Sequence, residues 1–116
     1  SLKRRILEVM TELKPYRDAD FNVSKLAELS SIQGYTVSYI LGKSFKKKFS
    51  DFVNEYRILE AKEKLVDPSL SHFKISTHAY DCGFNSLSAF NAAFKKFTGM
   101  TPSNYKNHMN GSLSDL

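Results

Sequence analysis

The sequence is poor in several features that would point to other classes of protein. Its one cysteine, Cys82, has no partner for an internal disulfide, which favours a reducing cytoplasm as its location. No apolar run approaches the ~18 residues that a membrane span needs, so we expect no membrane contact. The basic first residues are followed by Glu8 and Glu12, so no signal-peptide core develops. An initiator methionine is also missing, so we expect a fragment of a longer protein, with a trimmed start as the alternative.

Catalytic and metal-binding motifs are missing as well. His78 and Cys82 are four residues apart on a predicted helix, but a metal site would need two further ligands, and neither His72 nor His108 has a supporting spacing. No third group activates a Cys–His pair, and no glycine-rich phosphate loop occurs. We therefore expect no enzyme activity, no cofactor and no metal. His78 is expected to be a buried, hydrogen-bonded histidine.

Acidic residues are absent from two windows that contain lysines. Residues 29–50 contain four lysines and residues 82–114 contain three, with no Asp or Glu in either window. Together these windows carry a charge of +7, so the rest of the chain carries −2 of the net +5. Two separate acid-free basic windows are typical of two surfaces that meet a polyanion such as DNA. Chance clustering of solvated lysines is the alternative reading of the charge pattern alone.

The first part of the chain predicts two short helices. Apolar residues recur at helical spacing through residues 2–13, and Pro15 ends that pattern. Asn22 or Ser24 can cap the next helix, because either side chain can accept a hydrogen bond from a free backbone N–H group. Gly34 then suits a tight turn before the third helix.

Two longer helices are expected after this turn. One runs over about Tyr35–Phe45. Ser50 can cap the other, which ends at Asp67-Pro68 because proline cannot continue a helix. The second of these helices has an acidic surface, which suits a connecting strut and not a DNA-facing element. Its expected apolar positions are Phe52, Val53, Tyr56, Leu59, Ala61 and Leu65.

The last part of the chain predicts three further helices. A short helix over Ile75–Cys82 ends at Gly83, and Asn85 or Ser86 caps the next one. The buried stripe of that next helix contains Phe90, Phe94 and Phe97. A final helix begins where Thr101 places a capping hydroxyl before Pro102, and it runs through His108.

These patterns predict an all-α fold of about seven helices that form two helix-turn-helix subdomains joined by a long central helix. Ala27 and Ala79 lie in the first helix of each pair, where a small side chain lets two helices cross closely. The expected parts are a first subdomain at 1–49, a connecting helix at 50–67, a second subdomain at 68–108 and a flexible tail at 109–116.

The second predicted subdomain carries a long series of residues at fixed spacings. In order these are Ile75, Ala79, Gly83, Phe84, Asn85, Ser86, Ser88, Phe90, Phe94, Lys95, Lys96, Gly99, Thr101, Pro102 and Tyr105. This series resembles the AraC/XylS family of bacterial transcription regulators. The connecting helix also matches the family, through Phe49, Phe52, Arg57, Ala61 and Leu65. The first subdomain matches more weakly, through Leu26, Ala27, Ile32, Val37, Ser38 and Leu41. The resemblance covers about residues 3–108 and implies that each subdomain places one recognition helix in the DNA major groove.

The resemblance, together with the exposed helical phase, implies two sets of DNA-binding residues. The first set is Tyr35, Thr36, Ser38, Tyr39 and Lys43, and the second is Ser86, Leu87, Ser88, Asn91, Ala92, Lys95 and Lys96. By the family pattern the lysines are expected to contact phosphates, and Asn91 is expected to add a polar contact. The positions that match base readers are Tyr35, Ser38, Tyr39, Leu87, Ser88 and Ala92. Packing is the alternative role for the two tyrosines. Lys46, Lys47 and Lys48 either contact phosphates or form a solvated turn, and Arg57 is expected to be structural or backbone-anchoring.

Several residues depart from the family pattern. Tyr39 and Ala92 stand where arginine is common, and Lys46 stands where a glycine usually ends the helix. Leu87 and Ala89 are also apolar, so the second recognition helix has few side chains that can hydrogen-bond to bases. We expect it to rely on contacts with thymine methyl groups, on the DNA backbone and on DNA shape.

Sequence-specific binding to double-stranded DNA that regulates transcription is therefore the expected function. The expected partners are DNA and RNA polymerase, and the fragment is expected to be monomeric. The alternative is a protein-interaction module that contacts polymerase or another regulator and binds DNA weakly or without sequence preference.

Overall fold

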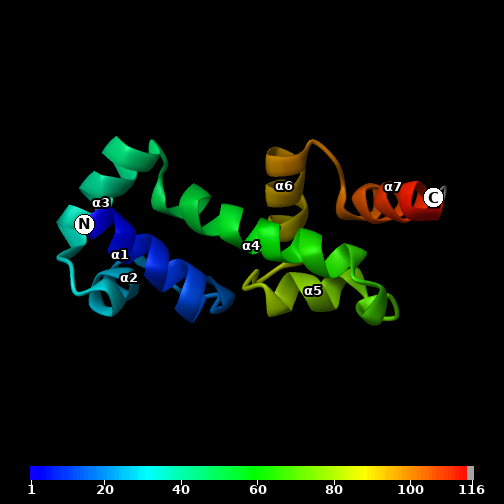
Figure 1. Cartoon of the computed structure of the whole chain (residues 1–116), viewed down its shortest axis with the longest axis horizontal. Helices are drawn as coiled ribbons and strands as arrows, with labels where there is room; N and C mark the ends of the chain where they lie inside the picture. The colour runs from blue at the N-terminus through cyan, green and yellow to red at the C-terminus, as the bar shows by residue number, and fades with distance from the viewer. Residues whose placement is uncertain (115–116) are drawn as a thin grey trace. The chain divides into compact units, whose positions relative to one another are not determined.

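The computed structural model describes residues 1–114, and this part of the chain contains seven α-helices and no strand (Figure 1). The all-α prediction is confirmed. The chain divides into two compact units, Ser1–Tyr56 and Arg57–Leu116, called unit 1 and unit 2 below. The division falls inside the longest helix, α4 (Phe49–Val66), so each unit takes one part of that helix.

Unit 1 packs three short helices and the first part of α4 around one apolar core. Its elements are α1 (Leu2–Glu8), the π-helical segment η1 (Val9–Leu13), the 3-10 segment η2 (Pro15–Arg17), α2 (Val23–Ser30), α3 (Gly34–Ile40) and the π-helical segment η3 (Leu41–Phe45). The core residues are Ile6, Val9, Met10, Tyr16, Phe21, Leu26, Ile32, Val37, Leu41, Phe52 and Val53. Because every element contributes to this core, burial fixes which face of α3 is left for solvent.

The turn between α2 and α3 is made by a serine and not by the expected glycine. Asn22 caps α2 as predicted, since its Oδ1 accepts from the Lys25 backbone N–H at 2.8 Å. Ser31 ends α2 in the left-handed conformation with φ 57°, whereas Gly34 is already the first residue of α3. The prediction that Gly34 makes the tight turn is therefore wrong. The turn closes through the Ile32 N–H, which donates to the Ala27 carbonyl at 3.0 Å.

Two details of α4 also differ from the sequence prediction. The helix begins at Phe49, and the Phe52 N–H donates to the Lys48 carbonyl at 3.0 Å, so Ser50 lies inside the first turn and is not its cap. Ile58 is buried, whereas Leu59 is 52% exposed. The sequence prediction included Leu59 among the apolar positions and omitted Ile58. The difference arises because the two ends of α4 pack into two different cores, so the buried face shifts along the helix.

Unit 2 has its own apolar core. Its further elements are the 3-10 segment η4 (Pro68–Leu70), α5 (Ile75–Asp81), α6 (Leu87–Thr98) and α7 (Pro102–Ser114). The core residues are Ile58, Ala61, Leu65, Ala79, Cys82, Phe84, Phe90, Ala93 and Phe94. The rings of Phe84, Phe90, Phe94 and Tyr105 form a chain of aromatic contacts, with consecutive ring centroids 5.3–5.6 Å apart. The predicted phenylalanine stripe of α6 is thus buried, with Phe97 half-buried at its end.

The helix ends of unit 2 agree closely with the sequence prediction. Gly83 follows α5 with φ 110°, and the Ser86 Oγ accepts from the Ala89 N–H at 3.1 Å, so Ser86 caps α6. The Thr101 Oγ1 accepts from the Asn104 N–H at 3.1 Å, directly before Pro102 at the start of α7. These caps fix where α6 and α7 begin, and so fix which side chains their first turns present.

The last helix is longer than the sequence predicts. α7 continues through Ser114, so residues 109–114 of the expected tail are helical, and residues 115–116 lie outside the described residues. Within the described part of the chain, no helix combines the length and the apolar character needed to cross a bilayer.

Candidate nucleic-acid interface

The third helix of unit 1 separates a buried stripe from an exposed polar face. Val37 and Leu41 are fully buried. The expected DNA-binding residues on this helix, which we call the first reading face, are Tyr35, Thr36, Ser38, Tyr39 and Lys43. All five project from the α3–η3 segment, and all but the half-buried Thr36 are exposed. Tyr35 and Tyr39 are 76% and 64% exposed, so packing into the core is not their role.

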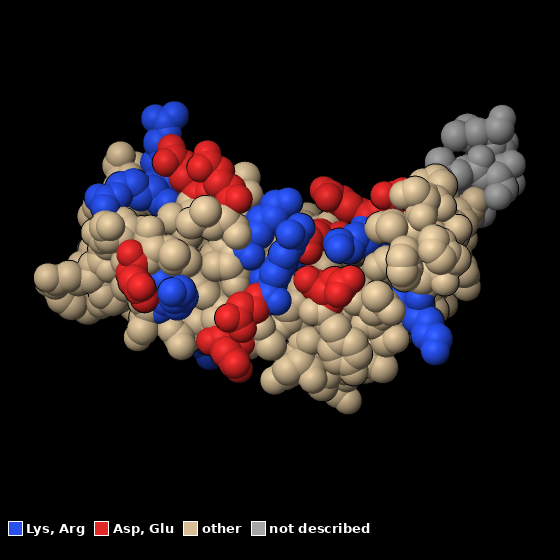
Figure 2. Space-filling view, turned by 90° about the horizontal axis from the view of Figure 1, so that it is seen from below, with Lys and Arg blue, Asp and Glu red and all other residues tan. Residues whose placement is uncertain are grey.

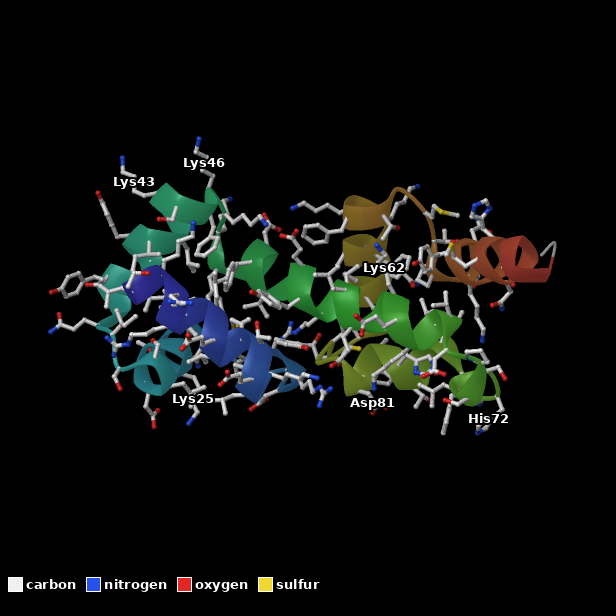
Figure 3. The ribbon with its side chains drawn as sticks, in the orientation of Figure 1. Lys25, Lys43, Lys46, Lys62, His72 and Asp81 are labelled. Atoms are coloured by element: carbon white, nitrogen blue, oxygen red, sulfur yellow. The ribbon has the colours of Figure 1, made fainter. Side chains whose placement is uncertain are left out.

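The lysine run after this helix divides into paired and unpaired positions. Lys46 ends η3 in the left-handed conformation with φ 55°, at the position where the family commonly has glycine. Its side chain and that of Lys43 project to the same side of unit 1, whereas Lys25 projects to the opposite side (Figure 3). The Lys47 ammonium is used within unit 1, where it forms an ion pair with Glu55 of α4. Lys43 of the first reading face, and Lys46 and Lys48 after it in the chain, therefore remain as exposed cations.

Lys3 joins this basic group although it lies 40 residues from Lys43 in the sequence. Its Nζ lies 5.1 Å from the centroid of the Phe45 ring, which brings the first turn of α1 beside η3. Nothing in the sequence signals this placement, because Lys3 lies far from Phe45 along the chain and is not among the residues that carry the family resemblance. The sequence-based site therefore missed a cation that only the packing of α1 on η3 adds.

The expected recognition helix of unit 2 corresponds to α6, and the exposed side of α6 is uncharged until its last turns. The second reading face consists of Ser86, Leu87, Ser88, Asn91, Ala92, Lys95 and Lys96, all exposed except the half-buried Ser86. The Ser86 hydroxyl accepts a hydrogen bond from the Ala89 N–H and so caps α6, which gives this residue a structural role. Leu87 is 41% exposed although it is a large apolar residue. Lys96 is folded back, with Nζ 5.8 Å from the Phe97 ring centroid, whereas Lys95 faces a groove.

This groove, which we call the α6 groove, is an open hollow of about 490 Å³ in unit 2. Four residues of the second reading face line it, together with residues from the first turns of α5 and α7. The lining residues are Leu87, Asn91, Ala92 and Lys95 from α6, Ile75 and Ser76 from α5, and Thr101, Pro102 and Ser103 around the start of α7. The sequence did not assign the α5 and α7 residues to a site, because their meeting with α6 depends on how the three helices pack.

Comparison with known proteins identifies the family of this chain. A family model described as a helix-turn-helix domain matches residues 26–108, which include both reading faces. The chain belongs to the AraC-type helix-turn-helix family. Among curated proteins, none matches this chain.

Several solved structures resemble this AraC-type domain. The C-terminal domain of the two-component response regulator yesN from Fusobacterium nucleatum is 27% identical, with 90% of this chain and 96% of that chain covered and a TM-score of 0.74. A DNA-binding transcriptional dual regulator from Escherichia coli K-12 is 21% identical, with coverages of 93% and 97% and a TM-score of 0.77. The DNA-binding domain of AdpA, solved with a target DNA, is 20% identical, with coverages of 96% and 94% and a TM-score of 0.77. The family and the fold of this chain are thus those of DNA-binding transcription regulators and not of enzymes.

His78 lies in the unit 2 core of this AraC-type domain without the hydrogen bond that the sequence analysis expects. The side chain is 2% exposed, and its Nε2 has no hydrogen-bond partner. Its neighbours include the Phe73 ring, with centroids 6.1 Å apart. Burial lowers the pKa of His78, the cations Lys64 and Lys106 lower it further, and Asp81 opposes them. Burial is therefore confirmed, but the expectation of a satisfied imidazole is wrong for Nε2, and the side chain is held neutral.

Arg57 is another buried charged residue, and its position fits a structural role. It is only 9% exposed, and its guanidinium carbon lies 5.6 Å from the centroid of the Phe84 ring, which belongs to the unit 2 core. A guanidinium on an aromatic face gains favourable electrostatic contact while its aliphatic part stays in apolar surroundings. Within the described residues, no group of three or more His, Cys, Asp or Glu side chains is placed to hold a metal ion.

Away from the reading faces, the surface of this AraC-type domain carries charges of both signs. On the face that Figure 2 shows, Lys and Arg side chains lie among Asp and Glu side chains. Pairs of this kind join Arg4 to Glu8 at 3.6 Å and Lys25 to Glu28 at 3.5 Å. Such exposed pairs contribute little to stability but cancel charge locally. The acid-free segments that carry the reading faces therefore differ from the mixed surface elsewhere.

Proposed function

We propose that this domain binds double-stranded DNA with sequence preference and thereby regulates transcription. The α3–η3 segment and α6 would each enter one of two adjacent major-groove segments. The observation that carries the proposal is that each unit pairs a buried apolar stripe with an exposed helix face in an acid-free segment. The AdpA DNA-binding domain, which shares the fold, was solved with a target DNA, and this supports the same partner here.

The two sets of residues have different roles in this proposal. Tyr35, Ser38 and Tyr39 offer hydroxyl groups and aromatic edges to bases, with Thr36 partly buried at their margin. Lys43, Lys46 and Lys3 meet the phosphates on the same side of unit 1, since cations set affinity and register while groove-facing side chains set the choice of sequence. In unit 2, Ser88, Leu87, Asn91 and Ala92 meet bases, whereas Lys95 meets phosphate.

The deciding experiment is selection of bound sequences from a random double-stranded DNA pool, followed by affinity measurements on the winners at two salt concentrations. We expect a motif with two half-elements about one helical turn apart, bound more tightly than random DNA at both salts. Binding that depends on salt but not on sequence would contradict the proposal of sequence-specific readout.

A second candidate function is suggested by the apolar character of α6. Leu87, Ala89 and Ala92 are exposed but offer no hydrogen-bonding group, which also suits contact with RNA polymerase or another regulator. Salt separates the two functions, because DNA binding weakens steeply as ionic strength rises while an apolar interface tolerates it. We further propose that the domain is monomeric at micromolar concentration, since its two reading faces already double the DNA contacts of one chain. A dimer in sedimentation at that concentration would contradict this.

A further inference from the structure

We propose that the α6 groove selects thymine through its C5-methyl group, and that Asn91 selects an adenine at a neighbouring base pair. The second half-element would then be rich in A·T pairs and defined by apolar contact. This inference rests on the proposed DNA binding and specifies what unit 2 prefers.

The lining of the α6 groove limits which base edges it can favour. Ile75, Leu87, Ala92 and the buried Pro102 contribute side chains without a donor or acceptor, and the other lining residues are polar: Ser76, Asn91, Lys95, Thr101 and Ser103. In the major groove, thymine is the base that presents an apolar group, whereas the edges of guanine, cytosine and adenine need hydrogen-bond partners. Placing a polar base edge against the four apolar side chains would remove it from water without compensation. The apolar part of the α6 groove therefore favours a thymine methyl group over a polar base edge.

The accessibility of Leu87 is what makes the contact possible. It is the first residue of α6, and the N-terminal residues of a recognition helix commonly reach base edges. Its side chain is 41% exposed and lines the groove, so it is positioned to cover a methyl group without any change in the fold.

Asn91 adds a polar partner on the same side of the helix. It lies four residues after Leu87, so both side chains project from one helix face, and both line the α6 groove. A carboxamide can bond adenine at N6 and N7 together. No arginine occurs in α6, and Lys95, which lines the groove one turn beyond Asn91 and could also read guanine, is assigned to phosphate in the proposed function. The side chains that unit 2 offers to bases, Leu87 and Asn91, thus fit a step that contains an A·T pair.

The test uses the sequence recovered from the random pool and replaces each thymine, one at a time, by uracil, which lacks only the methyl group. We expect at least one position in one half-element where uracil weakens binding about fourfold, the effect of losing one buried methyl group. Replacing that thymine by cytosine should weaken binding further, and 5-methylcytosine should restore part of the loss.

The matching protein variants are Leu87→Ser and Leu59→Ser. Leu59 is a leucine of unit 2 with similar exposure, 52%, that does not line the α6 groove, so the same substitution there is the control. We expect Leu87→Ser to bind the thymine and uracil sites equally, while Leu59→Ser keeps the fourfold difference. Asn91→Ala should reduce discrimination against replacement of the neighbouring adenine. Since the three positions are exposed, thermal unfolding is expected to verify that each variant is folded.

The outcomes separate this inference from the proposed function. Sequence-specific binding without uracil sensitivity at any thymine would overturn the inference and leave the proposed function intact. Equal uracil sensitivity in the wild-type chain and in Leu87→Ser would also overturn it, because the methyl group would then meet another residue. Failure to recover any preferred sequence would overturn both.

Discussion

At the scale of single residues, His78 differs from the other buried polar groups. The buried Ser30 hydroxyl, for example, donates to the Leu26 carbonyl at 2.6 Å. The His78 Nε2 has no partner although the side chain is 2% exposed. An unsatisfied buried polar atom costs free energy that an apolar side chain of similar volume would not. The position is thus a local weakness of the unit 2 core.

We predict that His78→Leu raises the free energy of unfolding by about 1–3 kcal/mol at pH 7.5, because it removes that unsatisfied group. Urea denaturation followed by circular dichroism measures the change. His108→Leu is the matched control, since His108 is exposed and the same substitution there should change stability little. A His78→Leu variant less stable than the wild-type chain would mean that the imidazole makes a favourable contact in the folded core.

The same histidine predicts a pH dependence of stability. Burial and the cations Lys64 and Lys106 lower the pKa of His78 in the folded chain below the ordinary value of 6.5. The unfolded chain therefore binds a proton at a higher pH than the folded chain does. The contribution of His78 to the free energy of unfolding is therefore at its full value above about pH 6.5, and it is lost as the pH falls towards the lowered pKa. We expect the free energies of unfolding at pH 7.5 and pH 5.5 to differ less in His78→Leu than in the wild-type chain. An equal difference in the two proteins would mean that other titrating groups cause the pH dependence.

At the scale of the element, a capping side chain determines where α6, the proposed recognition helix of unit 2, begins. Ser86 satisfies the Ala89 N–H and has extended backbone angles, so α6 starts at Leu87 and its first turn faces the groove. The same chemistry starts α2 of unit 1 through Asn22 and Lys25. A short helix depends strongly on such caps, because it has few internal hydrogen bonds.

We predict that Ser86→Ala lowers the free energy of unfolding by about 1 kcal/mol, the usual cost of losing an N-cap. Ser88→Ala is the matched control, since Ser88 is exposed on the same helix and caps nothing. Chemical denaturation of the three proteins compares them directly. Equal stability of Ser86→Ala and Ser88→Ala would show that the cap contributes nothing measurable.

Two glycines should respond to alanine with opposite signs. Gly42 lies within η3 and has open space where the methyl group of an alanine would lie, so Gly42→Ala should stabilise the domain by about 0.5–1 kcal/mol through helix propensity. Gly99 has equal space but φ 77°, a left-handed conformation that alanine adopts at a cost of about 1 kcal/mol. Thermal unfolding gives both signs, and destabilisation by Gly42→Ala would indicate a contact within η3 that open space does not predict.

At the scale of the whole molecule, the excess positive charge is shared between the units. Unit 1 has ten Lys and Arg against seven Asp and Glu, and unit 2 has seven against five. Neither excess is large, so the position of the cations beside the reading faces matters more than net charge. Each unit brings at least one exposed lysine to its face, Lys43 in unit 1 and Lys95 in unit 2.

We predict that Lys43→Glu and Lys95→Glu each weaken DNA binding and reduce the salt dependence of affinity. The slope of log affinity against log salt is negative, and each lost phosphate contact should reduce its magnitude by about 0.9. The two losses should add. Lys25→Glu, with the same charge change on the opposite side of unit 1, is the control (Figure 3). An unchanged slope in both variants, or an equal fall in Lys25→Glu, would argue against localised phosphate contacts.

Most of the helices and caps could be predicted from the sequence because they depend on local chemistry. Asn22, Ser86 and Thr101 are predicted as possible caps, and all three act as caps. The errors arise where a position depends on distant packing. Ser31 takes the turn predicted for Gly34, because the energy of the whole α2–α3 pair outweighs the preference of one residue for a left-handed conformation.

The fold class, the two helix-turn-helix units and the two acid-free segments follow from the sequence without the structure, since periodicity, caps and charge are properties of neighbouring residues. Which side chains from different segments meet depends instead on tertiary packing. Packing brings Lys3 beside Phe45, and it joins Ile75 and Pro102 to Leu87 in the α6 groove. It also leaves His78 without a partner for Nε2. These contacts arise from burial of two apolar cores, which brings together residues far apart in the chain, and no local pattern encodes that proximity.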